Sequence, residues 1–275
     1  MGYIILNKEE LAPGIKLFDI DAPQIAKKFQ PGQFIILRIS QKGERIPLTI
    51  VDAEEKRGSI RIIFQEVGKT TTELGAMERG QSIMDVLGPL GKPSEIRKYG
   101  NIIGIGGGVG AAPLLPILRA LKKMGNRIIT ILGARSEKYI ILQKELRATS
   151  DELIITTDDG TLGEKGFVTF PLKRLLENGK KPDLVWAIGP LIMMKNVCVI
   201  TKSFEVKTIV SLNPIMLDGT GMCGCCRVTI GGHTKFCCVD GPEFDGHLVD
   251  FDEIILRNNR FLEQEKISLE KYRNG

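Results

Sequence analysis

The chain has 275 residues, of which 43% are hydrophobic and 26% charged, and its formal net charge is +5. This length allows two medium domains and a small module, and the composition is that of an ordinary globular protein with its own core. The mild charge, without Lys/Arg blocks interleaved with aromatic residues, argues against nucleic-acid binding.

The start of the chain has no basic segment followed by an apolar one, so no signal peptide is expected. The longest apolar run, residues 101–121, contains five glycines and two prolines, which favours a strand, loop and helix over a membrane span. We therefore expect a cytoplasmic protein without membrane contact.

Residues 1–97 predict an antiparallel β-barrel. Turn motifs rich in Pro and Gly separate short strand patterns at residues 3–6, 15–20, 34–39, 48–53 and 59–66. One helix is expected at residues 71–77, and the Pro/Gly-rich segment 88–93 marks the exit from this domain.

Polar residues at two places in the barrel are candidates for cofactor binding. Arg45 can contact a phosphate bidentately, and Thr49 can donate its hydroxyl to a ring nitrogen, which makes Thr49 the candidate catalytic residue. A second anion site can form where the helix opens, at Gly68, Lys69, Thr70 and Thr71. Taken singly, each feature is better explained as structural.

Residues 98–206 alternate between strand and helix patterns, which predicts a doubly wound parallel sheet. The strands are expected at residues 101–105, 127–132, 152–157 and 184–188, and the helices at 113–124, 140–148 and 171–178.

Two motifs in this region are candidate dinucleotide contacts. The first is a glycine run between a strand and a helix, where a pyrophosphate can approach the backbone, at Gly106, Gly107, Gly108, Val109 and Gly110. The second follows a later strand, where carboxylates can accept ribose hydroxyls, at Asp158, Asp159 and Gly160. A tight strand-to-helix turn and a plain Asp–Gly turn are the structural alternatives.

Residues 207–248 form a cysteine-rich module that is too small for its own core, so we expect a metal to hold it. Plant-type 2Fe–2S sites use Cys-x4-Cys-x2-Cys and a distant fourth cysteine. Here the same spacing gives Asp218, Cys223, Cys226 and Cys238, with aspartate in the first position. Zinc is the rival metal, although only one Cys-x2-Cys pair is present.

The remaining cysteines have simpler interpretations. Cys225 and Cys237 are expected to be small buried side chains, and Cys198 a core residue. Cys225 is the main rival of Asp218 as the fourth ligand, but it adjoins Cys226, and neighbouring side chains on an extended chain point to opposite faces. The tail, residues 249–275, is charged and helix-like, which favours a solvated terminal helix.

The ordered set of motifs resembles the ferredoxin–NADP reductase superfamily. The motifs are Arg-x-Pro-Leu-Thr, Gly-Lys-Thr-Thr, GIGGGVGAAPL, TDDGTLGEKGFVT and the cysteine module. Within it, the chain is similar to electron-transfer subunits of dihydroorotate dehydrogenase. The aspartate at the first cluster position most resembles the small subunits of NADH-dependent reduced ferredoxin:NADP oxidoreductases, also called sulfide dehydrogenases.

The resemblance implies a role for each motif. FAD would be lined by Arg45, Pro47, Leu48, Thr49, Ile63, Phe64 and Gln65, with Thr70 and Thr71 at its pyrophosphate. NAD(H), or alternatively NADP(H), would be held by Gly106 to Gly110 and by Asp158 to Gly160. The 2Fe–2S cluster would be held by Asp218, Cys223, Cys226 and Cys238.

The resemblance also implies a larger iron–sulfur flavoprotein partner, in a heterodimer that couples NADH, NADPH and ferredoxin by flavin-based electron bifurcation. Two other functions remain open. One is an electron-transfer subunit of dihydroorotate dehydrogenase or of a sulfur-reducing hydrogenase. The other, from a different class, is a zinc-stabilised nucleotide-binding module without redox activity.

Overall fold

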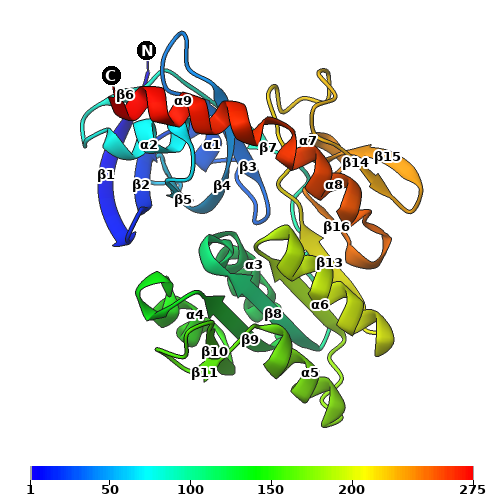
Figure 1. Ribbon diagram of the computed structural model, residues 1–275. Helices are drawn as coiled ribbons and strands as arrows, with labels where there is room; N and C mark the ends of the chain where they lie inside the picture. The colour runs from blue at the N-terminus through cyan, green and yellow to red at the C-terminus, as the bar shows by residue number, and fades with distance from the viewer. Residues whose placement is uncertain (1, 275) are drawn as a thin grey trace.

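The computed structural model describes residues 2–274, and Figure 1 shows its arrangement. The first part of the chain forms a seven-stranded antiparallel sheet with the order β6-β1-β2-β5-β4-β3-β7. Its strands are β1 (Tyr3–Ala12), β2 (Ile15–Asp21), β3 (Phe34–Arg38), β4 (Arg45–Glu54), β5 (Ser59–Gln65), β6 (Ser82–Ile83) and β7 (Asp85–Leu90), with helices α1 (Pro23–Ala26) and α2 (Lys69–Ala76). The predicted antiparallel barrel is confirmed.

Alternation along these strands builds the barrel interior. Apolar side chains such as Ile5, Phe18 and Ile35 are completely buried in one cluster, while the adjacent Leu17 and Phe34 are buried in clusters shared with residues beyond position 100. Phe18 and Phe64 pack edge to face, with ring centroids 5.2 Å apart. This packed interior fixes the positions of β4 and β5, which carry the candidate flavin residues.

The second sheet has the order β11-β10-β9-β8-β12-β13-β16. Its strands are β8 (Asn101–Gly107), β9 (Arg127–Ala134), β10 (Glu152–Thr157), β11 (Glu164–Lys165), β12 (Leu184–Ile188), β13 (Thr208–Ser211) and β16 (Glu243–Asp245). All pairs are parallel except β13 with β16. The chain winds outward in both directions from β8 and β12, so the switch point, where such sheets bind ligands, lies between these two strands.

Helices cover both faces of this sheet, as expected for a doubly wound fold. One core contains α3 (Ala111–Lys123) and α4 (Gln143–Thr149), and the other contains α5 (Thr169–Glu177) and α6 (Leu191–Ser203). Short 3-10 turns, η1 (Gly108–Gly110) and η2 (Glu137–Tyr139), connect strands to helices. Among residues 2–274, no helix is both long and apolar enough to span a membrane.

The cysteine module consists of the hairpin β14 (Arg227–Ile230) and β15 (His233–Phe236), followed by α7 (Cys237–Asp240) and the turn η3 (Gly246–Leu248). Its Cys226, Val228 and Cys238 share one apolar cluster with Met194 and Val197 of α6. The module therefore packs on the nucleotide sheet, to which it also contributes β16. The division of the chain after residues 97, 206 and 248 stays our proposal for its domains.

The tail forms α8 (Phe251–Asn258), the turn η4 (Asn259–Phe261) and α9 (Leu262–Asn274). Phe251 and Ile254 anchor α8 in the core of the module, whereas α9 has no buried residue. In Figure 1, α9 leaves the module and runs across the barrel near α2, so the tail joins two parts of the molecule.

Candidate functional site

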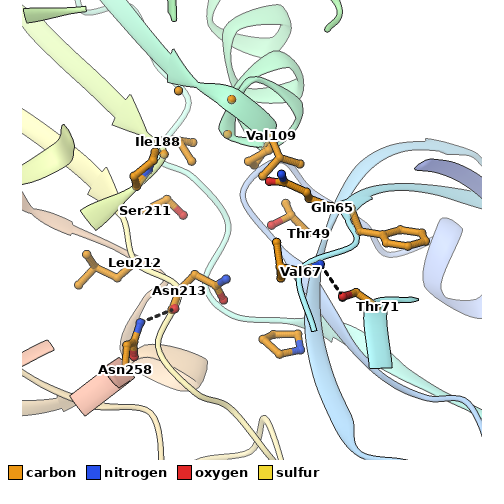
Figure 2. A pocket seen from close by; sticks show the side chains of 18 of the residues that line it. Thr49, Gln65, Val67, Thr71, Val109, Ile188, Ser211, Leu212, Asn213 and Asn258 are labelled. Atoms are coloured by element: carbon orange, nitrogen blue, oxygen red, sulfur yellow. Dashed lines mark hydrogen bonds between the residues drawn. The ribbon is translucent and has the colours of Figure 1, made fainter. Parts of the chain in front are cut away.

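Four parts of the chain line one cavity of about 1810 Å³. They are the barrel, through β4 and β5; the nucleotide sheet, through the loop after β8 and the ends of β9, β10, β12 and β13; the cysteine module, through Cys225 and Arg227; and the tail from α8 to α9. Figure 2 shows Thr49, Gln65 and Thr71 on the barrel side, facing Ser211 and Asn213. The cavity exceeds the roughly 300–1,000 Å³ of a typical single-ligand pocket, so it has room for two large ligands.

The barrel side of the cavity contains every residue that the sequence predicted for its strands. They are Arg45, Pro47, Leu48 and Thr49 of β4, and Ile63, Phe64 and Gln65 of β5. Because β4 and β5 are hydrogen-bonded neighbours, these residues form one continuous surface. Within residues 2–274 Arg45 forms no ion pair, which leaves its guanidinium charge available to an anion.

The start of α2 is only partly as predicted. Thr71 lines the cavity, but Gly68, Lys69 and Thr70 do not. The buried Thr70 donates its hydroxyl to the Glu44 carboxylate at 2.6 Å. The Thr71 hydroxyl oxygen instead accepts from the backbone N–H groups of Val67 and Gly68, both at 3.0 Å (Figure 2). This cap fixes the end of β5 against the helix and aims the first turn of α2 at the cavity.

The glycine loop lies at the switch point of the sheet. Gly107, Gly108, Val109 and Gly110 line the cavity, whereas Gly106 is buried behind them. Gly108 has a φ of 55°, which glycine adopts without strain. A side chain at Gly110 would collide with the carbonyl oxygen of Ile188. The loop therefore presents bare backbone at the start of α3, as phosphate binding requires.

In the segment 158–160, one residue is placed as a dinucleotide contact would be and the other two form a plain turn. Asp158 lines the cavity together with Arg135, as a ribose or phosphate contact requires. Asp159 does not line it and accepts from the Thr161 backbone N–H (3.0 Å) and hydroxyl (2.6 Å). The Thr161 hydroxyl holds the pKa of Asp159 below its usual range. Asp159 and Gly160 thus form a turn that supports Asp158.

The four candidate metal ligands lie in the cysteine module as two pairs, Asp218 with Cys223 and Cys226 with Cys238. The Asp218 carboxylate accepts from the backbone N–H groups of Thr220 at 2.8 Å and Cys223 at 2.7 Å, and these bonds lower its pKa. The sulfur atoms of Cys226 and Cys238 lie 3.2 Å apart and are buried. The loop can close tightly because it contains glycines with positive φ at Gly219, Gly221 and Gly224.

The donor set fits a two-iron cluster. Within the described residues, no three His, Cys, Asp or Glu side chains converge on one point. The donors form two adjacent pairs, Asp218 with Cys223 and Cys226 with Cys238, which suits two irons with two protein ligands each.

The other cysteines point elsewhere. Cys225 is only partly buried and lines the large cavity, so the expectation of a buried side chain is wrong for it, whereas its neighbour Cys226 is buried beside Cys238. Cys237 is completely buried, and burial raises its pKa. Cys198 is a core residue whose pKa burial raises to about 12.

Several cavity residues were not predicted from the sequence. Ser211 ends β13 and Leu212 and Asn213 follow it, and the Asn258 side chain donates to the Asn213 carbonyl at 3.3 Å (Figure 2). Their position at the carboxyl end of a parallel strand was the signal that could have found them. The tail contributes a second group, namely Arg257, Asn258, Arg260, Phe261, Gln264, Glu265 and Ser268. The polar sequence of the tail contains no motif that would have indicated its place at the cavity.

A buried carboxyl group joins the domains beside the site. Glu243 of β16 accepts from the Ser94 hydroxyl at 2.8 Å and from the Trp186 indole N–H at 3.1 Å. Ser94 lies in the linker after the barrel and Trp186 lies in β12, so Glu243 connects three parts of the chain. Burial raises the pKa of Glu243 to about 7.

Two family models match the chain. Residues 105–199 match the oxidoreductase NAD-binding domain, and residues 213–250 match the iron–sulfur cluster binding domain of dihydroorotate dehydrogenase B. The first contains the glycine loop and the second contains the four candidate metal ligands. The chain therefore carries an NAD-binding domain and an iron–sulfur domain.

Named relatives match almost the whole chain. A dihydroorotate dehydrogenase B (NAD(+)) electron transfer subunit homolog of Thermotoga maritima is 50% identical over 268 residues, which are 98% of this chain and 94% of the relative. The dihydroorotate dehydrogenase B (NAD(+)) electron transfer subunit of Desulforamulus reducens is 32% identical over 242 residues, which are 85% of this chain and 92% of the relative.

Solved structures of related proteins have the same fold as this chain. A chain from the NADH-dependent reduced ferredoxin-NADP oxidoreductase structure, described in terms of flavin-based electron bifurcation, has a TM-score of 0.94 and 49% identity, covering 99% of this chain and 98% of that one. Phthalate dioxygenase reductase shares the fold, with a TM-score of 0.59 and 16% identity. The match covers 89% of this chain and 95% of that one.

Proposed function

This chain belongs to the family of dihydroorotate dehydrogenase B electron transfer subunits, and from that membership we propose that it binds FAD between NAD(H) and a 2Fe–2S cluster. It is an oxidoreductase of the ferredoxin–NADP reductase type. In the proposed activity it exchanges hydride with NAD(H) and passes single electrons through the cluster to a larger partner subunit.

The observation that carries the proposal is that one cavity meets all three sites. Thr49 of the barrel, Gly108 of the dinucleotide loop and Cys225 of the cysteine loop line the same space. A flavin on the β4–β5 surface would have a nicotinamide on one side and the cluster loop at its edge. When bound, the flavin supplies the conversion between two-electron hydride transfer and one-electron transfer.

The protein contributes binding and orientation. Arg45 would pair with a flavin phosphate, together with the first turn of α2 behind Thr71. The Thr49 hydroxyl would orient the flavin ring by donating to a ring nitrogen. Pro47, Leu48 and the β5 residues Ile63, Phe64 and Gln65 would form its apolar and amide contacts, with Gly68, Lys69 and Thr70 shaping the turn.

The remaining roles concern NAD(H) and the metal. The backbone from Gly106 to Gly110 would hold the pyrophosphate of NAD(H), and Asp158, supported by Asp159 and Gly160, would accept ribose hydroxyls. Asp218, Cys223, Cys226 and Cys238 would ligate the cluster.

We further propose that the partner is a larger iron–sulfur flavoprotein and that the complex couples NADH, NADPH and ferredoxin by electron bifurcation. The 49% identical structural neighbour, described in those terms and matching the chain end to end, supports this assignment. The relatives named as dihydroorotate dehydrogenase B subunits support a second candidate, in which the same electron path serves dihydroorotate oxidation.

The test is to purify the chain with its natural partner and to record the visible spectrum, the iron content and the released flavin. Flavin and 2Fe–2S absorption with FAD recovered after heating is the expected result. A colourless zinc protein, or recovery of FMN alone, would contradict it. A co-purifying flavoprotein with further iron–sulfur clusters would favour bifurcation, and a dihydroorotate dehydrogenase would favour the second candidate.

A further inference from the structure

One face of the carboxy-terminal helix is turned toward the cavity. Gln264, Glu265 and Ser268 of α9 line it, together with Phe261, the last residue of the preceding turn η4. Their spacing of three, one and three residues is that of a single helix face. Lys266 and Glu270 of the same helix do not line the cavity, so the helix has a cavity face and an outer face.

The chain's own packing does not account for this arrangement. No residue of α9 is buried, and Phe261 is 48% exposed although it is aromatic. Among the interactions within residues 2–274, no ion pair or side-chain hydrogen bond holds the helix from Leu262 onward to the barrel. The helix nevertheless lies against α2. Its cavity face consequently has contact groups left for a ligand.

The position of α9 indicates which end of a ligand it meets. The first turn of α2, behind Thr71, is the proposed site for a flavin phosphate, and α9 packs on that same helix. Gly108 and Asp158 follow β8 and β10 of the nucleotide sheet, whereas α2 belongs to the barrel. A group that follows the flavin phosphates therefore reaches α9, whereas the adenosine of NAD(H) lies toward Asp158.

The chemistry of the face matches a nucleoside. An exposed aromatic ring offers a stacking surface to a base, the Gln264 amide can both donate and accept, and the Glu265 carboxylate can accept ribose hydroxyls. Arg260, which also lines the cavity, adds a guanidinium for a phosphate. We propose that α9 binds the adenosine half of FAD and closes the cavity over it. This inference rests on the proposed function, in which the flavin is FAD.

The test uses the full-length chain with its flavin bound. Phe261 and Gln264 are both changed to alanine, and Lys266→Ala on the outer face is the matched control. Dilution of the loaded protein, followed by flavin fluorescence, gives the dissociation constant. We expect the double variant to weaken FAD binding about tenfold or more, because base stacking on an aromatic side chain contributes about 1–3 kcal/mol. Lys266→Ala should match the parent.

Two further measurements make the test specific. The dissociation constant of FMN, measured on the same chains after flavin exchange, should not change, because FMN has no adenosine. The KM for NADH should not change either. Unchanged FAD binding, an equal loss of FAD and FMN, or a raised KM for NADH without loss of FAD would each overturn the inference while leaving the proposed function standing. A parent chain that binds no flavin would overturn both.

Discussion

The cavity has two kinds of wall. The barrel strands and the glycine loop rest on packed cores, and Ile105 and Ala111, on either side of the loop, are completely buried. The cysteine loop is open by comparison. Its Met222 is 89% exposed, Cys223 is exposed, and much of its shape depends on backbone bonds to the Asp218 carboxylate.

This difference indicates which binding surfaces already have their final shape before a cofactor binds. Apolar packing positions the flavin and dinucleotide surfaces whether or not a ligand is present. The cysteine loop contains few apolar contacts of its own, so metal binding supplies much of its order. Changes in the loop should therefore abolish the cluster, while changes in the packed walls should weaken binding by degrees.

The largest expected effect is loss of the cluster from Asp218→Ala, because that change removes both a proposed ligand and the carboxylate that accepts two backbone N–H groups of the loop. Asp218→Cys should keep the cluster, with a changed spectrum and potential, since thiolate is the softer ligand. Iron content and visible absorption measure both outcomes, and flavin binding should survive in both variants.

Cys225→Ser is the matched control, because this thiol lies in the same loop but lines the large cavity. It should retain the iron content of the parent protein. Loss of iron from Cys225→Ser together with its retention in Asp218→Ala would show that Cys225 is the fourth ligand.

The second effect is a dependence of stability on pH that comes from Glu243, the buried carboxyl group that connects the barrel linker to the nucleotide sheet. Burial raises the pKa of Glu243 to about 7, from an ordinary value of 4.5, so the folded protein holds a proton that the unfolded chain releases. The free energy of unfolding should therefore fall as pH rises from about 4.5 to about 7, by about 3 kcal/mol from this group. Above that range its contribution stays lost.

Glu243→Gln tests this effect because the amide oxygen can still accept from Ser94 and Trp186 but does not ionise. Denaturant unfolding across this pH range should show a smaller decline for the variant than for the parent. The exposed Glu270→Gln should behave like the parent. An identical decline in all three proteins would exclude Glu243 as its source.

Much of this arrangement could be predicted from sequence because it is local. Short strand patterns between turn motifs predicted the barrel, the glycine run predicted the loop at Gly108, and the ligand spacing predicted the four candidate metal residues. The helix at Leu191–Ser203 was not expected, because its β-branched residues, such as Val197 and Ile200, are poor helix formers and tertiary packing decides their state.

Contacts between distant parts of the chain could not be predicted from the sequence, because no local pattern specifies the partner. The strand Glu243–Asp245 pairs antiparallel with Thr208–Ser211, and nothing in three residues specifies that distant partner. The tail, residues 249–275, was expected to be a solvated helix, which holds for α9 but is wrong for α8, because Phe251 and Ile254 are buried. Its cavity face carries mostly polar groups, so hydrophobic periodicity could not reveal it.

The smallest expected effect is a graded loss of flavin from the packed wall. Arg45→Ala removes a charge-assisted phosphate contact and should weaken flavin binding by about 1.5–3 kcal/mol. The exposed Arg273→Ala is a control of the same charge change. Flavin content per chain after gel filtration measures both, and unchanged occupancy in Arg45→Ala would mean that the flavin lies elsewhere.

The most direct test of the account is rapid anaerobic mixing of the purified chain with NADH. We predict that the flavin absorbance bleaches, that the cluster absorbance decreases with it or after it, and that Asp218→Ala keeps only the flavin change. These results would follow from one cavity that joins the three sites. A flavin that NADH does not reduce in the isolated chain, or a cluster that is reduced without the flavin, would contradict the account.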